Sequence, residues 1–244
     1  MTPDELIDYV CPKIRDLGWA HYFVAETMQR GTELGLDGLR FYFIGRGGVL
    51  GDVEASVVRA AFGYFEPGLI TKMWDSSRRV IDPRTAGRDY VACAAEHGRR
   101  KLSDVADLEA FVAALDAVND AADETGLSLY AAAKAEPFVE DAPGRAMQLL
   151  ALLREFRGSA HLMGLRVVGL DSATAHAANR PGDLAMFGWA SDALPEITDE
   201  HRARRDEAER LTDQIVRPAY AALDESQQQA LVSGIDAVEK ALTS

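Results

Sequence analysis

The segment LLREFRGSAH, residues 152–161, holds the side chains of this sequence best suited to chemistry. Arg154, Glu155, Arg157 and His161 fall within eight residues. Two guanidinium groups can bind a carboxylate, a phosphate or an enolate, and an imidazole whose ordinary pKa is about 6.5 can move a proton near neutral pH. The segment therefore predicts a site for an anionic or carbonyl-bearing small molecule. Arg154 and Arg157 would bind it, and His161 and Glu155 are the candidate catalytic groups.

The helix expected over residues 143–168 has to position these groups. One apolar stripe on it is formed by Leu149, Leu152, Leu153, Phe156, Ala160, Met163 and Val167. Arg154, Arg157 and His161 share a different face, which also carries Leu150 and Leu165. A helix that is apolar around so much of its circumference should be largely buried. Since a buried charge needs a partner, we expect acidic partners from other elements.

Arg46, in the segment IGRGGVLG, is the best candidate to join this cluster, because its flanking glycines permit close approach of a backbone or a ligand. Two interpretations stay open. The arginines and His161 either bind a ligand, or they form a salt-bridge network that locks two halves of the protein together, with Gly158 letting another backbone come close. Taken alone, the residues favour the network, because ion pairs perturb charged groups as readily as active sites do.

The composition limits the classes of partner. The chain has 244 residues and a formal net charge of -13, with 26 Lys and Arg against 39 Asp and Glu. Such a surface repels phosphate backbones and anionic membranes, so DNA is not the expected partner. Cys11 and Cys93 are far apart and predict neither a disulfide framework nor a metal site. Without a basic leader or a long apolar run, the sequence predicts a soluble, cytoplasmic protein without a membrane span.

Apolar residues recur at spacings of three and four along nearly the whole chain, which predicts an all-α fold in two helical halves. Two prolines, a glycine and three acids at 135–144 place a boundary between residues 1–136 and 143–244. Ser103, Asp171 and Thr198 are the expected N-caps. Expected helices cover Pro3 to about Leu34 with a break near Pro12, then 37–46, 53–64, 67–75, 84–99, 103–125, 127–135, 143–168, 171–178, 199–223 and 225–242.

Two further patterns bear on the second half. Segments around Phe43 and Phe156 align with a shift of 113 residues, and Pro67 aligns with Pro181 at a shift of 114, so the halves could descend from a duplication or match by chance. The arginine-rich segment 202–210 contains three acids and reads as a solvated helix face.

The sequence resembles an actinobacterial family of helix-turn-helix-related, SalK-like proteins that is distantly similar to MarR-type winged-helix regulators. The resemblance rests on the segments HYFVAE (21–26), FIGRGGVLGDV (43–53), VVRAAFGYFEPGLI (57–70) with Trp74, and LLREFRGSAHLMGL (152–165). It adds Tyr22, Glu26, Phe62 and Trp74 to the candidate substrate-binding residues, beside Arg46, Arg154 and Arg157.

The departures from the family pattern matter for function. Ser159 and Ala160 stand where the family has Asp-Gly before the histidine, so a carboxylate next to the candidate site is missing. After residues 188–194 the recognition helix and wing of the family are shortened, and Pro195 follows almost at once. The resemblance thus implies a degenerate winged-helix-like second half. Its last two helices would form a homodimer.

The sequence is consistent with three functions. We expect a small-molecule-binding protein, with an enzyme of specialised metabolism as its most specific form. Cofactor, ligand and reaction are left undetermined. The alternatives are a MarR-like ligand-responsive transcriptional regulator, which the resemblance favours, and a structural or partner-binding dimer in which the buried charges only stabilise the fold.

Overall fold

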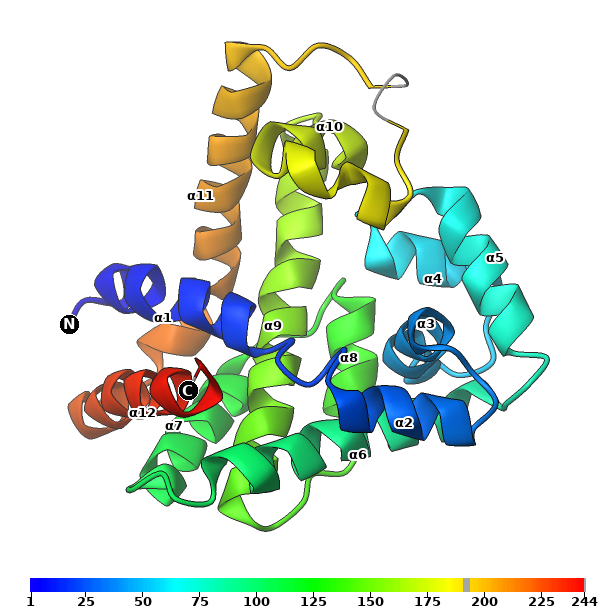
Figure 1. Cartoon of the computed structure of the whole chain (residues 1–244). Helices are drawn as coiled ribbons and strands as arrows, with labels where there is room; N and C mark the ends of the chain where they lie inside the picture. The colour runs from blue at the N-terminus through cyan, green and yellow to red at the C-terminus, as the bar shows by residue number, and fades with distance from the viewer. Residues whose placement is uncertain (191–193, 244) are drawn as a thin grey trace.

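The computed structural model describes residues 1–190 and 194–243, and within them the chain forms helices and no strand (Figure 1). The expected all-α fold is confirmed. The helices are α1 (Pro3–Leu17), α2 (Ala25–Glu33), α3 (Gly38–Gly48), α4 (Ala55–Phe62), α5 (Pro67–Ser77), α6 (Pro83–Leu102), α7 (Leu108–Ala121), α8 (Ser128–Lys134), α9 (Ala142–Val167), α10 (Ser172–Asn179), the 3-10 helix η1 (Pro181–Phe187), α11 (Asp199–Ala221) and α12 (Glu225–Thr243).

Helix α9 runs through the middle of the molecule and positions the residues of the opening segment (Figure 1). Asp141 caps its N-terminus by accepting a hydrogen bond from the backbone N–H of Gly144. Its end is closed by Gly169 at φ +69, a conformation that glycine adopts without strain. Leu150, Phe156 and Leu165 are all buried, as the apolar coverage of this helix predicts.

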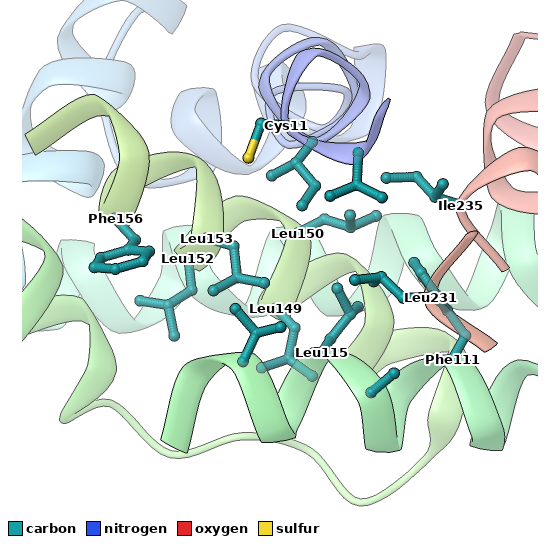
Figure 2. Packing of buried hydrophobic residues seen from close by; sticks show 14 of the residues in the cluster. Cys11, Phe111, Leu115, Leu149, Leu150, Leu152, Leu153, Phe156, Leu231 and Ile235 are labelled. Carbon is teal, nitrogen blue, oxygen red and sulfur yellow. The ribbon is translucent and has the colours of Figure 1, made fainter. Parts of the chain in front are cut away.

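The main hydrophobic core surrounds the N-terminal half of α9 (Figure 2). Leucines of α9 pack there against residues of α7 and α12, among them Phe111, Leu115, Leu231 and Ile235, and Cys11 of α1 lies at the edge of the labelled group. Helices on both sides of the loop at 135–141 therefore contribute to one core. The apolar face of α12 is used inside this chain.

A second, aromatic core lies between α3, α4, α5 and α6 and contains Phe41, Phe43, Phe62, Phe65 and Trp74. The motif IGRGG of α3 owes its glycines to this packing. A side-chain carbon on Gly45 would lie 2.6 Å from the ring of Tyr90, and one on Gly48 would lie 1.9 Å from the carbonyl oxygen of Pro83. The glycines thus let α3 and α6 pack in direct contact. Arg46, which lies between Gly45 and Gly47 in the sequence, hydrogen-bonds to Glu155 of α9 instead.

We expect Gly48→Ala to lower the free energy of unfolding by about 1–3 kcal/mol, because α3 or α6 must shift to relieve the clash with Pro83. Gly158→Ala is the matched control, since no atom lies within 4 Å of the added carbon. There the higher helix propensity of alanine should stabilise the protein by up to about 1 kcal/mol. Urea denaturation of both variants measures the two changes in stability, and equal changes would contradict the prediction.

Two expected helix boundaries are wrong. Pro12 does not break the first helix but lies inside α1, because Val10, Cys11 and Ile14 around it are buried in the main core and hold the helix together. The chain leaves the helix at Gly18, where a side-chain carbon would lie 2.6 Å from the carbonyl oxygen of Leu150.

The second wrong boundary concerns Ser103. This residue ends α6 instead of starting the next helix, because the buried Leu102 extends α6 to that point. Helix α7 begins only at Leu108, after Asp107 at φ 54.

The C-terminal helices form where the sequence places them. Thr198 and Asp171 cap α11 and α10, as expected. Part of the segment 188–194, whose shortening was inferred from the family pattern, lies outside the described residues. The hypothesis of an internal duplication stays a prediction.

Of the helices described here, none combines the length and the apolar character that a membrane span requires.

Candidate functional site

A cleft of about 210 Å³ lies between the C-terminal half of α9, the ends of α1, α3 and α4, and helices α10 and α11. It contains Arg46, Phe62, Arg154, Glu155, Arg157 and His161, so six of the nine candidate residues share one cavity. Arg15 and Arg180 also line it. Its arginines are Arg15, Arg46, Arg154, Arg157 and Arg180, and its carboxylates are Asp16, Glu155 and Glu209. We call it the cationic cleft.

Arg46 and Glu155 form a bidentate ion pair at the inner wall of the cationic cleft. Arg46 Nε and Nη2 each donate to a different oxygen of the Glu155 carboxylate at 2.7 Å. The exposed fractions of the two side chains are only 12% and 8%. Burial raises the pKa of Glu155, but the charge and hydrogen bonds of Arg46 outweigh it and leave this pKa below its ordinary value. Glu155 is therefore ionised and fully engaged at neutral pH.

Arg154 lacks a strong partner. Its Nη1 lies 3.4 Å from both Tyr22 Oη and Glu155 Oε1, and Glu155 is already held by Arg46. Nothing in the described chain hydrogen-bonds to its Nε or Nη2, and its Nε is buried. The guanidinium carbon lies 5.4 Å from the centre of the Tyr22 ring, a cation–π arrangement. The cleft thus holds a cation with hydrogen-bonding capacity to spare.

Arg157 finds its acidic partners on α11, as expected for a buried charge on α9. Its Nη2 donates to Glu209 at 2.8 Å and to Asp213 at 2.9 Å. The interpretation of residues 202–210 as a solvated face is therefore wrong for Glu209, which is half-buried between Arg157 and Arg205. Glu209 also brings a carboxylate to 3.9 Å from His161 Nε2, so the expectation that the site lacks a neighbouring carboxylate is wrong. Gly158 has no backbone packed against it.

His161 is held by a short hydrogen-bond chain that determines its tautomer. Thr212 Oγ1 donates to the Ala208 carbonyl oxygen at 2.6 Å, so its proton is committed. The Nδ1 of His161 lies 2.9 Å from the same Oγ1 and must therefore be the donor of that hydrogen bond. Burial lowers the pKa of His161 below 6.5, with Glu209 opposing and Arg157 adding to the effect. The neutral ring then presents the Nε2 lone pair as a proton acceptor.

We expect His161 to titrate below pH 6.5 and to be protonated at Nδ1 when neutral, which a ¹⁵N NMR titration of the imidazole measures. Thr212→Val removes the acceptor and should favour the Nε2-protonated ring, whereas Thr212→Ser should preserve the wild-type tautomer. Because the folded pKa lies below the unfolded one, His161 stabilises the fold above pH 6.5. That contribution declines as pH falls through the folded pKa, by up to about 1.4 kcal/mol per pH unit. A midpoint above 6.5 would contradict this account.

Three candidate residues lie outside the cationic cleft. Tyr22 is buried behind it and donates to Glu155 Oε1 at 3.1 Å, so it acts on the cleft through the ion pair. Trp74 is fully buried in the aromatic core and donates to the Val53 carbonyl oxygen. Glu26 lies on α2 near Arg100, with its carboxylate largely exposed. The structure does not bring Trp74 and Glu26 to the site.

Sequence reasoning missed several groups in the cleft. Arg15, Tyr64, His176 and Arg180 line it from α1, the turn after α4, and α10. Arg180 forms no ion pair with any part of the chain described here, and Tyr64 stacks on His161 with ring centres 6.2 Å apart. Nothing in the local pattern signals them, because they reach the site from three separate parts of the chain. Among the described residues, no group of three or more His, Cys, Asp or Glu could hold a metal ion.

The comparison with protein families decides the relationship. A model described as a helix-turn-helix family matches residues 12–183, more than half of the chain. The chain belongs to this helix-turn-helix family. The match covers α3, α4, α5 and nearly all of the cationic cleft on α9 and α10, and it ends before α11, which supplies Glu209 and Thr212. Comparisons with curated proteins and with solved structures gave no match.

Proposed function

We propose that this helix-turn-helix family protein binds an anionic small molecule in the cationic cleft. The observation that carries the proposal is Arg154, a guanidinium group in a cavity whose Nε and Nη2 have no acceptor in the described chain. Partly buried cations in a cavity are normally paired, so the missing acceptor is best supplied by a ligand. A carboxylate or phosphate matches the forked donor geometry of arginine. Arg180, which forms no ion pair with the described residues, adds to the attraction.

The same geometry supports acid–base chemistry on a ligand so bound. The Nε2 of neutral His161 can accept a proton from a group held against the arginines, and Glu209 at 3.9 Å stabilises the resulting imidazolium. Glu155 is a weaker catalytic candidate than the sequence predicts, since both oxygens are occupied by Arg46. The proposal therefore assigns proton transfer to His161 and gives Glu155 the task of positioning Arg46. An enzyme of specialised metabolism is the most specific form of this proposal.

A thermal-shift screen with small carboxylates and phosphates tests the binding proposal. Several such anions should raise the Tm of wild-type protein and raise that of Arg154→Ala much less. Arg79→Ala is the matched control, because Arg79 is an exposed arginine that does not line the cleft. Equal shifts in all three proteins would show that the anions bind elsewhere and overturn the proposal.

A second candidate function is a ligand-responsive transcriptional regulator, and membership of a helix-turn-helix family favours it. This membership favours DNA as a partner, contrary to the expectation from the sequence. The net charge of -13 opposes DNA binding. In this version the anion in the cleft would be the effector. Salt-sensitive, sequence-specific DNA binding in a gel-shift assay, altered by the anion, would select the regulator over the enzyme.

We also propose that the chain is related to actinobacterial SalK-like proteins and to MarR-type regulators. We further propose that it forms a homodimer through α11 and α12. Because the apolar side chains Leu231, Ile235 and Val238 of α12 are buried within the chain, such a dimer would rest on other residues of these helices. Light scattering at micromolar concentration would reveal a monomeric mass if the dimer does not form.

A further inference from the structure

A second cavity, of about 70 Å³, lies behind the Arg46–Glu155 ion pair. Both residues line this cavity as well as the cationic cleft, so the ion pair separates the two. The remaining walls come mainly from α3, α6, α8 and α9 and are mostly apolar, with Leu129, Phe138 and Leu152 among them. We call it the inner chamber.

Two polar atoms on residues that line the inner chamber have no hydrogen-bond partner in the described chain. They are Nδ1 of His21 and the hydroxyl of Tyr90, whose residues are only 2% and 4% exposed. Their rings lie side by side, with centres 5.4 Å apart. Buried polar atoms in folded proteins nearly always have a partner. Two that lack one, on neighbouring rings that line the same cavity, indicate that a partner binds in the chamber.

The chamber is electrically neutral, in contrast to the cleft. Arg46 and Glu155 neutralise each other, and Glu136 accepts a hydrogen bond from Arg84 at 2.7 Å. Burial lowers the pKa of His21 to about 3 and raises that of Tyr90 well above its ordinary value, so both side chains are uncharged at neutral pH. An anion would find no unpaired cation here. The occupant must be neutral.

The cavity volume sets the size of the occupant. A buried water needs about 10–15 Å³ of such space, so the chamber admits a group of roughly five to seven non-hydrogen atoms. We propose that the inner chamber binds a neutral, mostly apolar ring carrying one hydroxyl or carbonyl oxygen, which hydrogen-bonds to Tyr90 and His21. This second site is independent of the anion-binding proposal.

Phenol and toluene, matched in size and different only in the hydroxyl, test the proposal by isothermal titration calorimetry. In wild-type protein phenol should bind at least tenfold more tightly than toluene. Tyr90→Phe should reduce this ratio about tenfold, because the partner hydroxyl is gone. Ala151→Leu places extra carbons at the chamber wall and should weaken both probes at least tenfold.

Arg154→Ala provides the control that separates this site from the cleft, since it should leave the phenol-to-toluene ratio unchanged even if all anion binding is lost. Circular dichroism confirms that each variant is folded. Failure of phenol to bind wild-type protein would mean that the chamber holds only water. A ratio unaffected by Tyr90→Phe would mean that phenol binds elsewhere. Either result overturns the proposal.

Discussion

Glu155→Ala is expected to lower the free energy of unfolding by about 3–5 kcal/mol, because it leaves Arg46 without its partner in a buried position. The loss also removes an acceptor from Tyr22 and the nearest carboxylate from Arg154. Three groups on three elements thus lose their electrostatic anchor at once. Urea denaturation at pH 7 measures the effect.

Glu200→Ala is the control for this substitution, because its carboxylate pairs with Arg204 on the exposed face of α11 and should contribute less than about 1 kcal/mol. Replacing the pair by apolar residues, in the double variant Arg46→Met with Glu155→Leu, should recover much of the stability lost in Glu155→Ala. If Glu155→Ala proved as mild as Glu200→Ala, the Arg46–Glu155 pair would not be the central contact of the cleft.

Arg154→Ala is expected to weaken binding of the best anion from the screen by a factor of about 30 to 1,000. Removing one member of a buried, hydrogen-bonded charge pair lowers affinity by about 2–5 kcal/mol. We expect a loss of about 2–4 kcal/mol here, because Arg157 and Arg180 remain in the cleft. Arg154→Lys should fall between wild type and alanine, since it keeps the charge and loses the forked donors. Isothermal titration calorimetry gives the three affinities.

The stability of Arg154→Ala itself should change little, because its ion pair with Glu155 is long, at 3.4 Å, and Glu155 keeps Arg46 as its partner. Loss of affinity without loss of stability separates a ligand-binding arginine from a structural one. An Arg154→Ala protein that is strongly destabilised and still binds the anion would support the salt-bridge interpretation of the segment 152–161.

The sequence predicts the all-α fold because spacings of three and four recur in nearly every segment. It also predicts the burial of α9, since Leu150 and Leu165 extend its apolar surface beyond one stripe. Arg46, Arg154, Arg157 and His161 could be grouped by their chemistry, and they do share one cleft. Helix continuity through Pro12 could not be read locally, because packing in the main core holds α1 together there.

The remaining parts of the site depend on tertiary contacts. Glu209 and Thr212 lie 48 and 51 residues after His161 in the chain and meet it only because α11 packs along α9. Counting charges in residues 202–210 cannot show which one faces inward. Trp74 and Glu26 are candidates only through the family resemblance, which matches residue types along the chain and does not show which of them line a cavity.

The structure of the protein crystallised with the tightest anion from the screen tests the central claim most directly. The account predicts the acidic group of the ligand in the cationic cleft, within about 3.2 Å of the Arg154 guanidinium nitrogens, with the Arg46–Glu155 pair intact behind it. A ligand bound outside the cleft, with the Arg154 guanidinium still lacking a close acceptor, would contradict it.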